Sequence, residues 1–404
     1  MTMKQTQTKM FDFADVGLDF CSGSKNLFPD RFKKMLSQGY NEQTVASVSV
    51  TGNQVTLNYG VAHGYAADRV LKINSGPLAV SNSGEYWIDA VTTTSLTMTI
   101  DAAPVSIAGG FSTKIASLGY ALEYENSNIQ VYKFKSLDES DLFLRLCFQD
   151  QSGRRNCISP CVGKSFDIAT GFITDVYAYA ENIQIQSPNT GFKWEFGFWN
   201  NTTYNNYTYT QGFSQYGRAC VVGSQYHLLF LFNALNEQPR INGLVPTYCH
   251  AYELLNYPVL IGETYGNITS IGGNFQGENA RAYVGNIRVA LSQDPGNAGN
   301  GLFRMPSASS SYLPTKIDSF STTTCAPLHI YEYPTLQHLG VVIGGLYSAM
   351  YGTANTPSTS YGIQPSVTVD IDLNSLIILH YISAGTSTSS FAFLAAPVEE
   401  IKIA

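Results

Sequence analysis

Residues 85–100, EYWIDAVTTTSLTMTI, contain the pattern that decides the fold. Leu96, Met98 and Ile100 alternate with threonines, and residues 85–91 alternate in the same way, with Tyr86 and Ile88 expected on the face opposite Trp87 and Asp89. Side chains that alternate with a period of two belong to a β-strand, because a helix would repeat every 3.6 residues. The stretch therefore predicts two strands joined by a threonine-rich turn.

The same period continues on the N-terminal side of this stretch. In QVTLNY, residues 54–59, Val55, Leu57 and Tyr59 share one face. The glycine-containing segments TGN, HGYAAD, SGPL and SNSGE separate these runs and supply turns. We therefore predict a small module of about five antiparallel strands over residues 46–108.

The remaining sequence, residues 109–404, repeats strand patterns without a convincing helix series. Residues 141–158 have the outline of a hairpin, and YHLLFLF, YPVLIG and LIILHYI are typical of buried strands. Many short strands predict an all-β fold, with the small antiparallel β-module followed by one or more β-sandwich or jelly-roll-like domains. The Gly-, Pro- and Ser-rich segment 295–315 is the candidate for a split of this large β-rich domain, and one domain or two stay open.

The first 45 residues predict an N-terminal docking segment with one short helix. Pro29 and Asp30 suit its first turn, Phe32, Met35 and Leu36 share a face, and Gly39 ends it. Such a segment packs on a neighbour or docks a subunit, and a plain tail is the alternative.

The composition excludes several classes of protein. The chain has 404 residues, of which 44% are hydrophobic and only 13% charged, with 26 tyrosines. A net charge of −7 argues against a nucleic-acid partner, because a phosphate footprint needs clustered Lys and Arg. We expect no membrane insertion, since no apolar run reaches the ~18 residues of a span, and the polar start lacks a secretory signal. These features predict a soluble protein made in the cytoplasm.

The usual signatures of cofactors and catalysis do not occur. Nucleotide-binding glycine loops, the nucleophile elbow and the HExxH motif are missing, so we expect no cofactor and no catalytic residue. The seven cysteines are odd in number and spread out, which predicts free thiols, and Cys157 and Cys161 lack the partners that a metal site needs. Asp370 and Asp372 have a spacing that would suit a glycosidase only if a cleft surrounded them, and the sequence shows no sign of one. Asp138, Glu139 and Asp141 are typical of a solvated loop, with a weak calcium site as the alternative.

One segment is rich in aromatic residues that alternate with Asn and Thr. Aromatic faces stack on sugar rings while amides bind hydroxyls, so a host surface glycan is one candidate partner. Cross-strand packing or a subunit contact is the other interpretation, and we favour it. The candidate residues for a glycan or subunit contact are Trp194, Trp199, Tyr204, Tyr207, Tyr209, Phe213 and Tyr216.

His63 and Gly64 lie in the segment VAHGY between two predicted strands. The histidine could hold a metal or a proton, or it could belong to the turn itself. Residues 48–107 resemble a small β-module of tailed-bacteriophage tail and baseplate proteins, on the strength of Val55-Thr56, VAHGY, DRVLKI, SGEYWIDAV and TTTSLTMTI. The chain differs in having YAA after His-Gly, where a leucine and a second glycine are commoner. The resemblance implies that His63 and Gly64 form a structural turn.

The resemblance and the composition together lead to an expected function. We expect a non-enzymatic structural virion protein of a tailed bacteriophage, assembling into the tail, the baseplate or an attached fibre. Its partners would be copies of itself and other virion proteins, and its location the virion. A glycan-binding adhesin on the phage tail and a capsid decoration protein are the alternatives.

Overall fold

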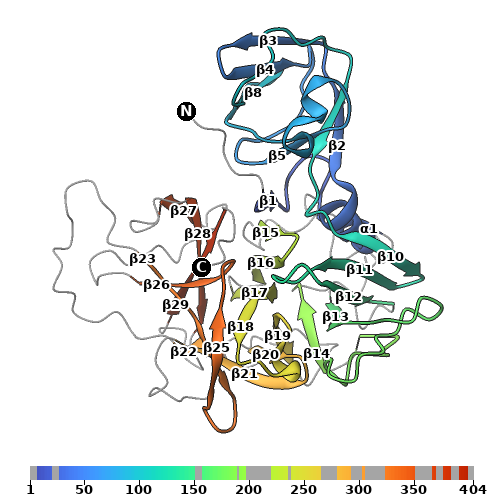
Figure 1. Ribbon diagram of the computed structural model, residues 1–404, viewed down its shortest axis with the longest axis vertical. Coiled ribbons are helices and arrows are strands. Elements are labelled where there is room, and N and C mark those ends of the chain that lie inside the picture. The colour runs from blue at the N-terminus through green and yellow to red at the C-terminus, as the bar shows by residue number, and fades with distance from the viewer. Residues whose placement is uncertain are drawn as a thin grey trace, which may run out of the picture.

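The protein is all-β, as predicted. The computed structural model describes residues 7–20, 27–150, 157–188, 191–196, 220–234, 238–264, 280–292, 303–304, 324–350, 366–369, 376–383 and 391–398. The strands gather in two lobes, a small one at the top of Figure 1 and a large one beneath it. Apart from a short helix near the N-terminus, the helical elements of the described residues are single turns.

The small lobe is a module of two four-stranded antiparallel sheets. One sheet has the order β2 (Tyr40–Thr44), β9 (Ser112–Ile115), β5 (Val70–Ile73) and β6 (Glu85–Trp87). The other has the order β3 (Ser47–Thr51), β4 (Gln54–Asn58), β8 (Ser95–Thr99) and β7 (Ala90–Val91). Two 3-10 turns, Pro77–Ala79 and Ser81–Gly84, precede β6. The module is thus larger than the roughly five strands predicted over 46–108, because residues 46–108 hold six strands and β2 and β9 from outside that range extend one sheet.

The alternation that predicted the module is present in its core. Leu57, Leu96 and Met98 are fully buried, whereas Thr97 between them is half-buried. Residues 85–91 are not the single strand predicted, because β6 ends at Trp87 and β7 of the other sheet begins at Ala90, and Tyr86 and Trp87 are both buried. Trp87 packs in a cluster with Met10 of the N-terminal segment, so the second face of β6 is covered as well.

The large lobe is built on one branched sheet of 16 strands. Its main path runs through β10 (Ala121–Asn126), β11 (Ile129–Lys135), β12 (Asp141–Phe148), β13 (Cys157–Gly163), β14 (Phe192–Glu195), β19 (Val259–Thr264), β20 (Ala280–Val284), β21 (Ile287–Ser292), β24 (His329–Glu332), β25 (His338–Val342) and β18 (Thr247–Cys249). A branch carries β17 (Gln238–Val245), β16 (His227–Ala234), β15 (Cys220–Ser224) and β1 (Lys9–Asp12), while β22 (Phe303–Arg304) pairs with β21. The predicted hairpin over 141–158 is confirmed, since β12 pairs antiparallel with β13.

A second sheet of five strands completes the lobe. It has the order β23 (Thr324–Ala326), β26 (Tyr347–Met350), β29 (Phe391–Pro397), β28 (Leu376–Ser383) and β27 (Ser366–Val369). In Figure 1, β15–β17 occupy the middle of the lobe, with β10–β13 on one side and β26–β29 on the other. His380 of β28 donates from Nε2 to the backbone oxygen of Arg240 in β17 at 2.7 Å, which ties the second sheet to the branch.

The central position of β16 explains its sequence. Phe230 packs into the cluster shared with β10–β14, whereas Leu229 and Leu231 pack into the cluster shared with β28 and β29. A strand that is buried on both faces needs a continuous apolar run rather than an alternating one. The run LLFLF at 228–232 meets that requirement.

The segment 295–315, where we placed a split, lies largely outside the described residues. Strands from both sides of it nevertheless belong to one sheet, because β21 pairs with β24 from Val289↔Glu332 to Ser292↔His329. The main sheet therefore continues past this segment.

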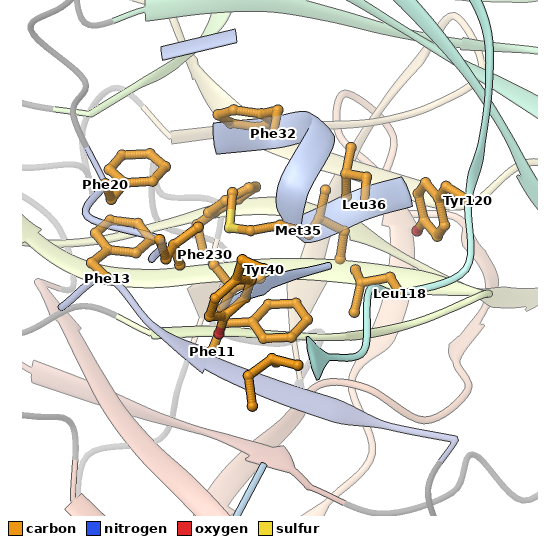
Figure 2. Close-up of a cluster of buried hydrophobic side chains, with 14 of the residues drawn as sticks. Phe11, Phe13, Phe20, Phe32, Met35, Leu36, Tyr40, Leu118, Tyr120 and Phe230 are labelled. Atoms are coloured by element: carbon orange, nitrogen blue, oxygen red, sulfur yellow. The ribbon is translucent and has the colours of Figure 1, made fainter. Parts of the chain in front are cut away.

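The N-terminal segment docks on its own chain. β1 adds a strand to β15, and α1 (Leu27–Lys33) continues into a π-helical turn (Lys34–Gln38) that Gly39 ends with a φ of 74°. Phe32, Met35 and Leu36 of this helix are fully buried, as predicted. Figure 2 shows them with other buried apolar side chains of the segment, including Phe11, Phe13 and Phe20, and with Phe230 of β16. We call residues 7–39 the N-terminal arm.

Buried ion pairs join the arm to the module. Arg69 of the module donates to Asp15 of the arm from Nε at 2.8 Å and from Nη2 at 3.0 Å, and Tyr40 donates its hydroxyl to Asp15 at 2.7 Å. Nζ of Lys9 in β1 forms an ion pair with Oε2 of Glu85 in β6, at 2.8 Å. Because β1 also belongs to the large sheet, these contacts fix the module to the large lobe. We call this set the joint.

Candidate functional site

Trp194, the first residue of the predicted aromatic contact, lies in the core. Its side chain is fully buried, and Nε1 donates to the backbone oxygen of Ile261 at 2.8 Å. Trp194 therefore cannot stack on an external sugar or contact a subunit, and that part of the prediction was wrong. Its position in β14, which is covered on both faces, explains the burial. The other six residues, Trp199, Tyr204, Tyr207, Tyr209, Phe213 and Tyr216, lie outside the described residues.

His63 and Gly64 have the geometry of a structural turn. The His63 side chain is buried, Nδ1 accepts from the backbone N–H of Tyr65 at 3.0 Å, and Nε2 donates to the oxygen of Ser95 at 3.1 Å. Gly64 has a φ of +72°, and a Cβ at this position would meet Val16 of the arm at 2.9 Å. Both ring nitrogens are thus used inside the module.

The carboxylates weighed for catalysis have ordinary surroundings where they are described. Asp138 lies in an exposed turn, where Oδ1 accepts from the hydroxyl of Ser140 at 2.5 Å and from its backbone N–H at 3.0 Å, and these two bonds hold the pKa of Asp138 below its usual range. Asp370 and Asp372 lie outside the described residues. Cys157 and Cys161 are both buried in β13.

A buried charged cluster lies where β14, β17 and β19 meet, and sequence reasoning missed it. Arg240 donates to Glu263, and Lys193 lies 3.7 Å from Glu195. Burial, followed by the neighbouring charge of Glu263, raises the pKa of Glu195. All four side chains are at least nine-tenths buried. The cluster joins strands in the interior and offers no exposed acid.

The strongest surface candidate is the segment around β18, TYCHAYELLNY at 247–257. Twelve large hydrophobic side chains are exposed in the described part of the chain, and five of them gather here. We call these five residues the β18 face: Val176, Tyr177, Tyr248, Tyr252 and Leu254, which are 79%, 36%, 71%, 66% and 46% exposed. Large exposed apolar side chains that gather in one place mark interaction sites more often than scattered ones.

Polar contacts hold the two parts of this face together. Asp175 accepts from the backbone N–H of Lys164 and from the hydroxyl of Tyr257, both at 2.7 Å. Lys164 lies over the ring of Tyr257 at 4.6 Å and donates to the backbone oxygen of Glu253 at 3.3 Å. Burial, followed by the bond to Asp175, raises the pKa of Tyr257. The loop that carries Val176 and Tyr177 is therefore fixed beside the loop that carries Tyr252 and Leu254.

A hollow of about 520 Å³ opens on this face. Tyr248, Tyr252, His250, Glu253 and Lys164 are among its lining residues. Two exposed phenol rings beside amine, carboxylate and imidazole groups could contact either another protein or a sugar.

Three of the six histidines converge beside the hollow. His250 follows β18, His338 begins β25 and His329 begins β24, so three neighbouring strands each place one histidine here. Nδ1 of His329 lies 3.1 Å from Nε2 of His338, and the His250 and His338 rings are 6.2 Å apart between centroids. Partial burial and the two neighbouring histidines lower the pKa of His338. The sequence carries no sign of this cluster, because strand pairing creates it.

Comparison with known proteins gave no relative: no protein-family model matches the chain, and no curated protein matches it. Among the helices of the described residues, none has the length and apolar character needed to cross a membrane.

Proposed function

We propose that the protein is a non-enzymatic structural subunit of a tailed-bacteriophage particle, assembling into the tail, the baseplate or an attached fibre. The observation that carries the proposal is the β18 face. Its five exposed apolar side chains have no cover from the described part of the chain, and a neighbouring subunit would remove them from water. Partners would be copies of the chain and other virion proteins.

The build of the molecule supports an assembly role. The arm and the large lobe share a strand pairing, and the buried Arg69–Asp15 ion pair joins the arm to the module. The module and the large lobe can therefore bind different neighbours while their relative position stays fixed. The residues that resemble a tail and baseplate module, from Val48 to Ile107, lie within a compact two-sheet unit at the far end of the molecule from the large sheets (Figure 1). Such a unit suits a repeated contact in a symmetric particle.

The experiment is sedimentation of the purified chain over a range of concentrations, alone and with particle components. We expect the wild type to associate and the double variant Tyr248→Ser/Tyr252→Ser to associate about tenfold or more weakly, since buried tyrosines are typical interface hot spots. Val80→Ser/Val105→Ser is the matched control, because these valines of the module are 87% and 94% exposed. A wild-type chain that stays monomeric in both settings would overturn the proposal.

A carbohydrate-binding adhesin is the second candidate function, and the hollow favours it. Tyr248 and Tyr252 offer stacking surfaces, while Glu253, His250 and Lys164 offer hydrogen-bonding groups to hydroxyls. In that case the same double variant would lose binding to host-surface oligosaccharides while its sedimentation stays that of the wild type.

A further inference from the structure

We propose that His329 and His338, joined by His250, form a binding site for a divalent transition-metal ion such as Zn²⁺ or Ni²⁺. The site is independent of the proposed function. It rests on the convergence of three histidines from three adjacent strands, of which His250 lines the hollow.

The separation of His329 and His338 fits a shared ion. Imidazole nitrogens bind Zn²⁺ at about 2.0–2.1 Å, so two nitrogens that share one ion must lie close to each other. The observed Nδ1–Nε2 distance is 3.1 Å. With bonds of that length it corresponds to a nitrogen–metal–nitrogen angle of roughly 100°, between octahedral and tetrahedral geometry. The two nitrogens are therefore close enough to share an ion once both rings turn their lone pairs toward it.

The backbone fixes this pair. β24 and β25 are hydrogen-bonded neighbours, with Tyr331 opposite His338 and a register shift between Ile330 and Tyr331. The two imidazoles consequently project from a paired sheet rather than from a free loop, and Tyr331 packs 5.3 Å from the His338 ring. A site whose ligands are held by a sheet loses less conformational entropy when the ion binds.

His250 supplies the third ligand after a rotation of its side chain. In the described residues, no three His, Cys, Asp or Glu side chains already stand in the geometry of a metal site. The His250 and His338 rings meet edge to face, with centroids 6.2 Å apart and an interplanar angle of 85°. The backbone N–H of His250 donates to Leu339 of β25 at 3.0 Å, which holds its Cα beside the strand, whereas its side chain is exposed and can turn.

Three imidazoles would leave at least one coordination position for water or for a group from a partner. This arrangement resembles neither a closed structural zinc site nor a cysteine site, and imidazole ligands favour zinc, nickel and copper over magnesium or calcium. The inferred ligand class is therefore a borderline transition-metal cation.

The test is calorimetric titration of the full chain, without a histidine tag, with Zn²⁺ and separately with Ni²⁺. We expect one ion per chain. Both His329→Ala and His338→Ala should weaken binding at least about tenfold, the lower end of what even an outer-shell change costs. His250→Ala should weaken it less than either, because the pair remains.

Gln337→Ala is the matched control, since Gln337 is an exposed neighbour of His338 on the same turn, and it should bind as the wild type does. Circular dichroism of each variant checks that the fold is kept. Binding that survives in the double variant His329→Ala/His338→Ala would overturn the proposal, as would a wild-type chain that takes up neither ion.

Discussion

The joint and the β18 face differ in which kind of side chain they bury and which they expose. At the joint, Arg69 and Asp15 are 4% and 11% exposed and pair through two hydrogen bonds. On the β18 face, Tyr248 and Tyr252 are 71% and 66% exposed. Charged groups are buried in one region, and apolar groups are exposed in the other. The difference separates contacts that the chain completes by itself from a surface that a partner could complete.

Substitutions in the two regions are therefore expected to change different properties of the protein. Substitutions at the joint should change the free energy of unfolding, whereas substitutions on the β18 face should change association and leave that free energy within about 0.5 kcal/mol.

The largest effect is expected from Arg69→Met. The variant leaves the Asp15 carboxylate buried without its cation, which typically costs about 3–5 kcal/mol. Denaturant unfolding of the full chain measures the loss. Lys133→Met is the control, because Lys133 pairs with Glu123 at a site where both side chains are about one-third exposed, and solvent-exposed pairs contribute little to stability. Equal losses in the two variants would remove the distinction between the joint and the surface.

A pH effect comes next, from the hairpin that receives β1. His227 is fully buried in this hairpin, with Nδ1 2.8 Å from the hydroxyl oxygen of Ser224. Burial lowers the pKa of His227 to about 3. The unfolded chain takes up this proton near pH 6.5, so the folded state keeps its full stability above that pH and loses it as the pH falls toward 3. At pH 5 the expected loss from this residue is about 2 kcal/mol.

The measurement is unfolding of the wild type, His227→Asn and His250→Asn at pH 7 and pH 5. His227→Asn should lose less stability than the wild type on acidification, while His250→Asn, on the exposed side, should follow the wild type. If all three lose the same amount, the burial of His227 does not govern this pH range.

The smallest effect is expected at the His-Gly turn. Gly64→Ala and Gly52→Ala both place a side chain at positive φ, +72° and +61°, which costs about 1–2 kcal/mol. Only the former also meets Val16 of the arm, while nothing lies within 4 Å of a Cβ at Gly52. Gly64→Ala should therefore be the less stable by up to about 1 kcal/mol, since Val16 is exposed and can shift. Equal stabilities would mean that the arm does not press on the turn.

The sequence predicted what local pattern determines. Alternation identified β4 and β8, and the apolar face of α1 identified Phe32, Met35 and Leu36 as buried. Alternation does not predict that a distant segment covers the second face of a strand, as happens where Trp87 of β6 packs in a cluster with Met10 of the arm. Trp194 was misjudged because the charged residues beside it in the sequence, Lys193 and Glu195, suggest an exposed strand, whereas β14 lies between β13 and β19 in the sheet.

The candidate site was harder to predict than the fold. The tyrosines of 247–257 are visible in the sequence, but their exposure depends on β18 lying at the end of the main sheet path. The three histidines meet only because β18, β25 and β24 are neighbours. Pairing between strands that are distant in sequence leaves no local pattern, so neither feature could be found from periodicity.

The most direct test of the assembly role is cryo-electron microscopy of the particle, or of the purified assembly, with the chain located in the density. The account predicts that a neighbouring subunit covers the β18 face in each copy, with Tyr248 and Tyr252 inside the contact. A particle without this chain, or copies whose β18 face all point to solvent, would contradict it.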